Sequence, residues 1–208
     1  KLVFFLPQTG IYLEQWEVLD IGLDQEFLMN TETEYELIAK NEVLPLYIPR
    51  TKFSHKGIYG HSLIIGGSYG KIGAVLLAAK SALQIGSGLV TAYVPKCGYN
   101  SLQTAIPEVM VITDGEETIS NIDFEISPKV IGIGMGMGTG KDTVKALETF
   151  LKGNTMPLVI DADGLNMLAK HKVLLSLLPA ASILTPHPKE LERLIGKWKD
   201  DFDKLNKT

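Results

Sequence analysis

The chain has 208 residues, 45% hydrophobic and 21% charged, a balance typical of a folded globular domain. Its net charge is −4 and it has no run of lysine or arginine, which argues against nucleic acid or an anionic membrane as a partner. A single cysteine, Cys97, excludes an internal disulfide, and no apolar run reaches the roughly 18 residues of a membrane helix. We therefore expect a cytoplasmic protein.

The N-terminal region is predicted to be separate from the main domain. Apolar stretches at residues 1–6 and 16–21 favour two strands, with a turn at residues 7–10 between them. Residues 24–41 are acidic and poor in large apolar side chains, as is typical of a linker. A domain boundary is accordingly expected within residues 24–43.

Residues 56–95 are predicted to form the unit around which the remaining chain folds. The apolar run of residues 62–65 suits a buried strand, residues 72–85 a helix that is apolar on most sides, and residues 89–94 a second strand. A strand, a crossover helix and a second strand form the right-handed unit from which parallel sheets are built. Ligands of such sheets lie beyond the carboxyl ends of the strands, so residues 66–73 are expected near a ligand.

The glycine-rich loop after the first strand does not match either familiar phosphate loop. Ile65 and Ile72 occupy the places where a P-loop requires a glycine and a serine or threonine, and no G-x-G-x-x-G motif is present. Backbone N–H groups at a helix N-terminus favour an anionic ligand group without specifying which. A turn glycine needed only for backbone geometry is the alternative interpretation.

Later in the chain, the same alternation of strands and helices continues. Strands are expected at residues 109–112, 130–133, 158–160 and 183–184, and helices at residues 98–105, from 141 onward and from 188 onward. The final stretch, residues 197–208, is rich in lysine and aspartate and is expected to be solvated.

Four strand ends carry unusual residues, at 66–73, 134–140, 161–166 and 185–188. Because the carboxyl ends of parallel strands share one edge of a sheet, we expect these segments to converge on one crevice. Gly134, Gly136 and Gly138 would let the backbone approach a ligand closely, or they would simply form a glycine-rich turn.

Three polar residues at these ends also have more than one interpretation each. Asp161 and Asp163 suit ribose hydroxyls, a Mg²⁺ ion held through water, or a helix cap. His187, between two prolines, suits a neutral imidazole that contacts a ligand, or an N-terminal cap. His55 and Lys56 precede the first strand, and a structural or subunit-contact role is expected for them. One cysteine and scattered histidines do not provide a zinc site.

An ordered series of motifs runs through residues 52–195. It includes K-G-x-Y-G-H-x-L-x-I-G-G-S-Y-G-K-x-G-A, G-x-G-x-G-T, D-A-D-G-L-N and T-P-H-P-x-E-L. The series resembles the NAD(P)H-hydrate dehydratase family, whose fold is ribokinase-like. The resemblance implies a three-layer α/β/α sandwich with a mainly parallel sheet, incomplete in its C-terminal part. Residues 1–23 resemble the closing segment of an NAD(P)H-hydrate epimerase domain, as in bifunctional repair enzymes.

These resemblances imply a domain plan and a reaction. Residues 1–24 would close an epimerase domain, residues 25–45 would be a linker, and residues 46–208 would begin the dehydratase domain. The enzyme would be a hydro-lyase in which ADP, or ATP in some relatives, with Mg²⁺ drives the removal of water from hydrated NADH or NADPH. By analogy, the substrate hydroxyl is phosphorylated and the phosphate then leaves.

The motifs also imply which residues bind the hydrated dinucleotide. They are Ala74, Gly134, Gly136, Gly138, Asp161, Asn166 and His187. No residue is assigned to a metal. Met135 departs from the proline that many relatives have, which alters loop stiffness and leaves backbone contacts possible.

One expected element of the family does not appear. The family's catalytic aspartate lies in a later G-x-G-D segment, and none follows Ile195, so this residue is expected beyond Thr208 and the 208 residues alone are expected to be inactive. Two other functions stay open: a ribokinase-like kinase of a small hydroxylated metabolite or vitamin precursor, and a non-catalytic binding module. A homo-oligomer is expected, with no nucleic acid or membrane as a partner.

Overall fold

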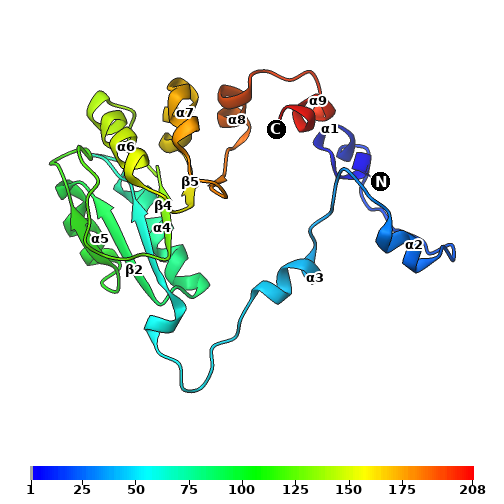
Figure 1. The fold of residues 1–208 in the computed structure, drawn as a ribbon, viewed down its shortest axis with the longest axis horizontal. Helices are drawn as coiled ribbons and strands as arrows, with labels where there is room; N and C mark the ends of the chain where they lie inside the picture. Colours follow the sequence, from blue (N-terminus) through cyan, green and yellow to red (C-terminus); the bar gives the residue numbers. More distant parts are fainter. Residues whose placement is uncertain (1) are drawn as a thin grey trace. The chain divides into compact units, whose positions relative to one another are not determined.

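The computed structural model describes residues 2–208, which divide into two compact units (Figure 1). The larger unit comprises Phe53–Lys197, and the smaller one combines the N-terminal 52 residues with Trp198–Thr208. Lys1, the first residue of the first predicted strand, lies outside the described residues. No helix among residues 2–208 is long and apolar enough to cross a membrane.

The larger unit contains a six-stranded sheet in which every pairing is parallel. Its strands are β1 (His61–Ile65), β2 (Leu89–Val94), β3 (Met110–Thr113), β4 (Val130–Ile133), β5 (Leu158–Ile160) and β6 (Ile183–Leu184). All six strands predicted for this unit are confirmed to within one residue. Their spatial order is β3-β2-β1-β4-β5-β6.

The strand order reverses between β1 and β4. The chain first proceeds outward from β1 to β3, and then returns to place β4 on the other side of β1. Ile65 pairs with Ile133, so these two strands end level with each other. A reversal of this kind separates the connections that leave the two strands and opens a crevice at their carboxyl ends.

Both faces of the sheet are buried, which explains why its strands read as continuous apolar runs. Leu63 and Ile65 of β1 join one core cluster with Ile131 and Ile133 of β4. Ile64, between them in sequence, points to the opposite cluster. The sheet is thus the middle layer of the predicted three-layer α/β/α sandwich.

Helices form the outer layers. One cluster is covered by α4 (Ile72–Ile85) and α5 (Tyr99–Ala105), and the other by α6 (Lys141–Gly153), α7 (Asp163–Lys170) and the 3₁₀ helix η5 (Lys172–Leu177). The helix α8 (Pro188–Ile195) packs against α7. The 3₁₀ helices η3 (Lys56–Tyr59) and η4 (Lys96–Gly98) precede β1 and α5. The predicted helix at residues 72–85 is confirmed.

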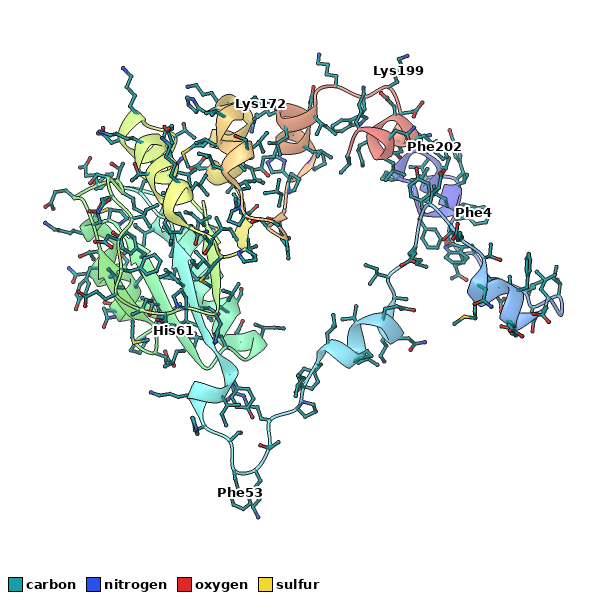
Figure 2. All side chains as sticks on the ribbon, viewed as in Figure 1. Phe4, Phe53, His61, Lys172, Lys199 and Phe202 are labelled. Atoms are coloured by element: carbon teal, nitrogen blue, oxygen red, sulfur yellow. The ribbon has the colours of Figure 1, made fainter. Side chains whose placement is uncertain are left out.

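The smaller unit consists of short helical segments. They are η1 (Leu2–Phe5), α1 (Pro7–Gly10), α2 (Gln25–Asn30), α3 (Lys40–Val43), η2 (Leu44–Leu46) and α9 (Asp201–Lys207). Phe4 and Phe5 pack against Trp16, with ring centroids 6.1 and 4.8 Å away (Figure 2 labels Phe4). Leu6 is the only buried residue that the structure describes in this unit.

Two predictions for this unit are wrong. Residues 2–5 form a 3₁₀ helix and residues 16–21 have no regular structure, because a strand needs a neighbour for its N–H and C=O groups and the described part of the unit provides none. The end of the chain is helical in α9, which Asp200 caps by accepting from the backbone N–H of Asp203. Gln8 and Asp201 exchange two hydrogen bonds, each 2.9 Å long.

Candidate functional site

The loops that follow β1 and β4 interlock at the point where the strand order reverses. Gly67 donates its backbone N–H to the carbonyl of Met135 at 2.8 Å, and the buried Ser68 hydroxyl donates to the carbonyl of Gly136 at 2.8 Å. A side chain on Gly66 would collide with the carbonyl of Met135. The convergence that the sequence predicts is therefore present for these two loops.

The three glycines after β4 differ in what surrounds them. A Cβ on Gly134 would lie 2.7 Å from the backbone nitrogen of Gly164, and one on Gly136 would lie 2.7 Å from the carbonyl of Lys71. The close approach of other backbone atoms is thus enough to require glycine at both Gly134 and Gly136. Gly138 meets nothing closer than Ser68 Oγ at 4.0 Å, although its φ of +79° also favours glycine.

Asp163, in the first turn of α7, connects three of the converging segments. Its Oδ2 accepts from the backbone N–H of Gly138 at 2.9 Å and lies 3.3 Å from Lys71 Nζ. Its Oδ1 accepts from Asn166 Nδ2 at 3.4 Å. Asp163 does not cap α7, whose N-cap residue is Ala162, so the capping interpretation of this aspartate is wrong.

Ala162 and Asp161 form the sharp turn between β5 and α7. Ala162 has a φ of 51°, a conformation that costs a residue with a Cβ about 1–3 kcal/mol and that accumulates at functional sites. Asp161 is half-buried, and its carboxylate has no hydrogen-bonding partner within residues 2–208. The turn therefore leaves one carboxylate at the carboxyl edge available to a ligand.

Asn166 extends the polar chain toward α8. Its Oδ1 accepts from Arg193 Nη1 at 2.6 Å. A hollow of about 390 Å³ lies beside this contact. It is lined by Thr139, Asn166, Ala169, Lys170 and Arg193. Two cationic side chains and an amide make this hollow suitable for an anionic or polar ligand group.

His187 begins α8, where the predicted capping contact is present. Its Nδ1 accepts from the backbone N–H of Lys189 at 3.2 Å, and Pro188 occupies the first helical position. Glu190 completes the turn by accepting from the backbone N–H of His187 at 3.0 Å. The His187 side chain is nevertheless 57% exposed, so the ligand contact stays a prediction.

The sequence reasoning missed four contributors to this edge: Lys71, the bridging role of Asp163, Arg193 and Glu190. Lys71 and Asp163 are 92 residues apart, so no local spacing could pair them. Glu190 did have a signal, because it stands three residues after the cap, as in a capping box. Ala74 is exposed in the first turn of α4, where an added Cβ on Gly136 would lie 3.2 Å from its own Cβ, and its contact with the dinucleotide stays a prediction.

A supporting loop borders the glycine turn after β1. Tyr69 donates its backbone N–H to the carbonyl of Glu117 at 2.8 Å, and Cys97 donates to that of Glu116 at 3.0 Å. Burial, with the negative charge of Glu117 as a smaller cause, raises the pKa of the Cys97 thiol. Cys97 is therefore a weak nucleophile beside the site.

Within residues 2–208 no group of three or more histidine, cysteine, aspartate or glutamate side chains is arranged to hold a metal ion. No chemical step is assigned to the implied Mg²⁺ here.

The fold and the crevice define the class of protein. The six-stranded parallel α/β/α sandwich is similar in fold to a solved ribokinase-like superfamily protein of Enterococcus faecalis, with a TM-score of 0.58 and 24% identity over 71% of this chain and 52% of that one. The family profile described as NAD(P)H-hydrate dehydratase matches residues 62–207, and the chain belongs to this family.

Individual relatives agree with this assignment. The bifunctional NAD(P)H-hydrate repair enzyme of Moorella thermoacetica is 33% identical over 94% of this chain and 40% of its own length. The ADP-dependent (S)-NAD(P)H-hydrate dehydratase of Streptococcus thermophilus is 41% identical over 71% of this chain and 53% of its own. The chain thus spans about half or less of the length of these relatives.

A solved structure agrees as well. The ADP/ATP-dependent NAD(P)H-hydrate dehydratase of Bacillus subtilis, co-crystallised with ATP and Mg²⁺, superposes with a TM-score of 0.60 and 27% identity. The match covers 76% of this chain and 55% of that one.

Proposed function

We propose that the protein containing this chain is an ADP-dependent dehydratase that removes water from hydrated NADH or NADPH and so restores the nicotinamide cofactor. The observation that carries the proposal is the carboxyl edge, where the loops at residues 66–68 and 134–138 interlock across the strand-order reversal and Asp163 links Gly138 to Asn166. Family membership of residues 62–207 supports it, and relatives are named for this reaction.

On this proposal, the residues of this chain hold the acceptor side of a phosphoryl transfer. The free carboxylate of Asp161 and the amide of Asn166 would orient hydroxyl groups of the dinucleotide, and Gly138 would admit its close approach. Ala74 and His187 would line the same crevice. Holding the acceptor hydroxyl in place supplies the positional part of catalysis. ADP, or ATP, would provide the phosphoryl group.

We further infer that the first part of the chain ends an epimerase domain in a bifunctional enzyme. The support is the extent of the alignments. The match to the bifunctional enzyme covers 94% of this chain, whereas the match to the single-function dehydratase covers 71%. The residues outside the dehydratase profile thus have counterparts in the bifunctional relative.

The test is an assay of the full-length protein with hydrated NADH and hydrated NADPH, each with ADP or ATP. We expect the absorbance of the dihydronicotinamide ring to return only when a nucleotide is present. A panel of vitamin-precursor alcohols with ATP serves as the comparison. Phosphorylation of one of these alcohols, without any dehydration of the hydrates, would refute the proposal and establish a kinase.

A further inference from the structure

The hollow of about 390 Å³ between α7 and α8 gathers positive charge. Its charged lining residues are Lys170, at the end of α7, and Arg193 of α8, and both are exposed. None of the residues that line it within residues 2–208 is acidic. The chain as a whole has a net charge of −4, so this positive surface is a local arrangement and does not follow from composition.

The charges of this hollow are not neutralised by the described part of the protein. Arg193 donates from Nη1 to the amide oxygen of Asn166 at 2.6 Å, and this partner is uncharged. Within residues 2–208, neither Arg193 nor Lys170 forms an ion pair. A guanidinium has five N–H donors and the contact with Asn166 uses one of them. Arg193 is therefore held in place and still has donors for an anionic ligand.

A neighbouring hollow extends the positive surface. It measures about 410 Å³ and shares two lining residues with the first, one of which is Lys170. It adds Lys141 and Lys145 of α6. Glu148 also lines it, but this carboxylate pairs with Lys152 at 2.6 Å. The excess of positive charge thus continues from α8 across α7 to α6.

The hollow adjoins the carboxyl edge at two residues. Thr139 follows Gly138, whose backbone N–H donates to Asp163, and Asn166 donates to the same carboxylate at 3.4 Å. Lys170 lies at the other end of α7 from Asp163, roughly 10 Å away along the helix axis. A ligand whose body occupies the edge would therefore reach these cations with a side branch.

We propose that this hollow binds the 2′-phosphate of hydrated NADPH, and that Arg193 and Lys170 are specificity-determining residues that favour it over hydrated NADH. A phosphate monoester carries a charge of about −1.5 to −2 at pH 7 and has three acceptor oxygens, which suit one guanidinium and one ammonium group. The 2′-phosphate is also a side branch of the dinucleotide, whereas the pyrophosphate is part of its backbone. The inference rests on the proposed function, because it assumes that the dinucleotide occupies the edge.

The first test compares kcat/KM for hydrated NADPH and hydrated NADH in the full-length protein at saturating ADP. Lys170→Gln should lower the ratio of the NADPH value to the NADH value by about tenfold, because a charge-assisted contact with the phosphate is lost. Arg193→Gln should do the same. Arg193→Lys keeps the charge without the planar fork and should lower the ratio less. Lys80→Gln, on the exposed face of α4 across the sheet, is the control and should not change it.

An unchanged ratio in the Lys170→Gln and Arg193→Gln variants overturns the proposal. An equal loss of kcat/KM for both substrates also overturns it, because the hollow would then hold a group that the two dinucleotides share, such as the pyrophosphate. Both side chains are exposed, so neither substitution removes a buried contact of the core.

The second test needs no turnover. Binding of NADPH and of NADH to the full-length protein is followed by dihydronicotinamide fluorescence, with saturating ADP present in both titrations. NADPH should bind about tenfold more tightly, the preference should shrink as salt is added, and Lys170→Gln should remove most of it. Equal affinities of the wild-type protein for NADPH and NADH overturn the proposal. If neither hydrate is dehydrated while NADPH still binds more tightly than NADH, the proposed function fails and the assignment of the hollow stands.

Discussion

Lys71 Nζ and Asp163 Oδ2 form an ion pair 3.3 Å long between residues 92 positions apart in the sequence. The same carboxylate oxygen accepts the backbone N–H of Gly138, so one atom joins the loops after β1 and β4 to the start of α7. The two contacts differ in environment, because the Lys71 side chain is 56% exposed and that of Asp163 only 18%.

The hydrogen bond to Gly138 should therefore matter more than the ion pair. Asp163→Ala leaves the Gly138 N–H without its acceptor and should lower the free energy of unfolding by about 1–3 kcal/mol. Lys71→Gln removes only a solvent-screened ion pair and should cost roughly 0–1 kcal/mol. Urea denaturation measures both. Asp163→Asn retains an acceptor for the Gly138 N–H and should lower the free energy of unfolding only as much as Lys71→Gln does. If Lys71→Gln and Asp163→Ala lower it equally, the ion pair dominates.

Gly73 provides a test of where the ligand lies. It is helical, and a Cβ there would meet nothing within 4 Å. Gly73→Ala should stabilise the protein by about 0.5–1 kcal/mol and yet weaken dinucleotide binding, because the new methyl group adds bulk to the first turn of α4, at the position before Ala74. Gly153→Ala, at the end of α6 and also with nothing within 4 Å, is the matched control. Gly153→Ala should stabilise the protein by a similar amount and leave its dinucleotide affinity unchanged. If Gly73→Ala and Gly153→Ala bind the dinucleotide equally well, the start of α4 is not part of the site.

Gly136 and Gly138 separate steric contact from backbone strain. Both have positive φ, but only Gly136 has a backbone atom, the carbonyl of Lys71, within 2.7 Å of an added Cβ. Gly138→Ala should cost about 1–2 kcal/mol from its left-handed conformation. Gly136→Ala should cost more and lose ligand affinity with it, because the glycine loop must move away from α4. Thermal denaturation measures the loss of stability in each variant, and calorimetric titration measures its ligand affinity. Similar losses of stability in the two variants would contradict the prediction.

His61 predicts a pH dependence of stability. It is labelled in Figure 2 and begins β1, where Nε2 lies 2.7 Å from Thr91 Oγ1. Burial lowers the pKa of His61 from its ordinary value of 6.5. As the pH falls through that value, the unfolded chain takes up a proton before the folded one does, so the free energy of unfolding decreases until the lower folded pKa is passed.

His61→Gln retains a polar partner for Thr91 and does not titrate. Stability measured by urea denaturation at about pH 8 and about pH 5 should therefore fall less in the variant than in the wild type. Carboxylates contribute to both proteins equally, so the difference between the two slopes isolates His61. Parallel slopes would mean that His61 titrates alike in the folded and unfolded chains.

Much of the larger unit could be predicted from the sequence. Strands buried on both faces must be continuously apolar, so β1, β4 and β5 were recognisable, and the glycine at the end of α4 marks its last turn through a left-handed conformation (φ 114°). The order of motifs also predicted the family, because it depends only on residue identities.

Other features depend on contacts between distant residues and required the tertiary structure. Residues 2–5 are apolar enough for a strand but form a 3₁₀ helix, because no described strand lies beside them to pair with. Strand formation depends on such neighbours and not on composition alone. The sequence could not tell that Gly134 and Gly136 are required by the chain's own packing, whereas Gly138 is open. It also could not join Lys71 to Asp163, because only the return of β4 to the side of β1 brings their loops together.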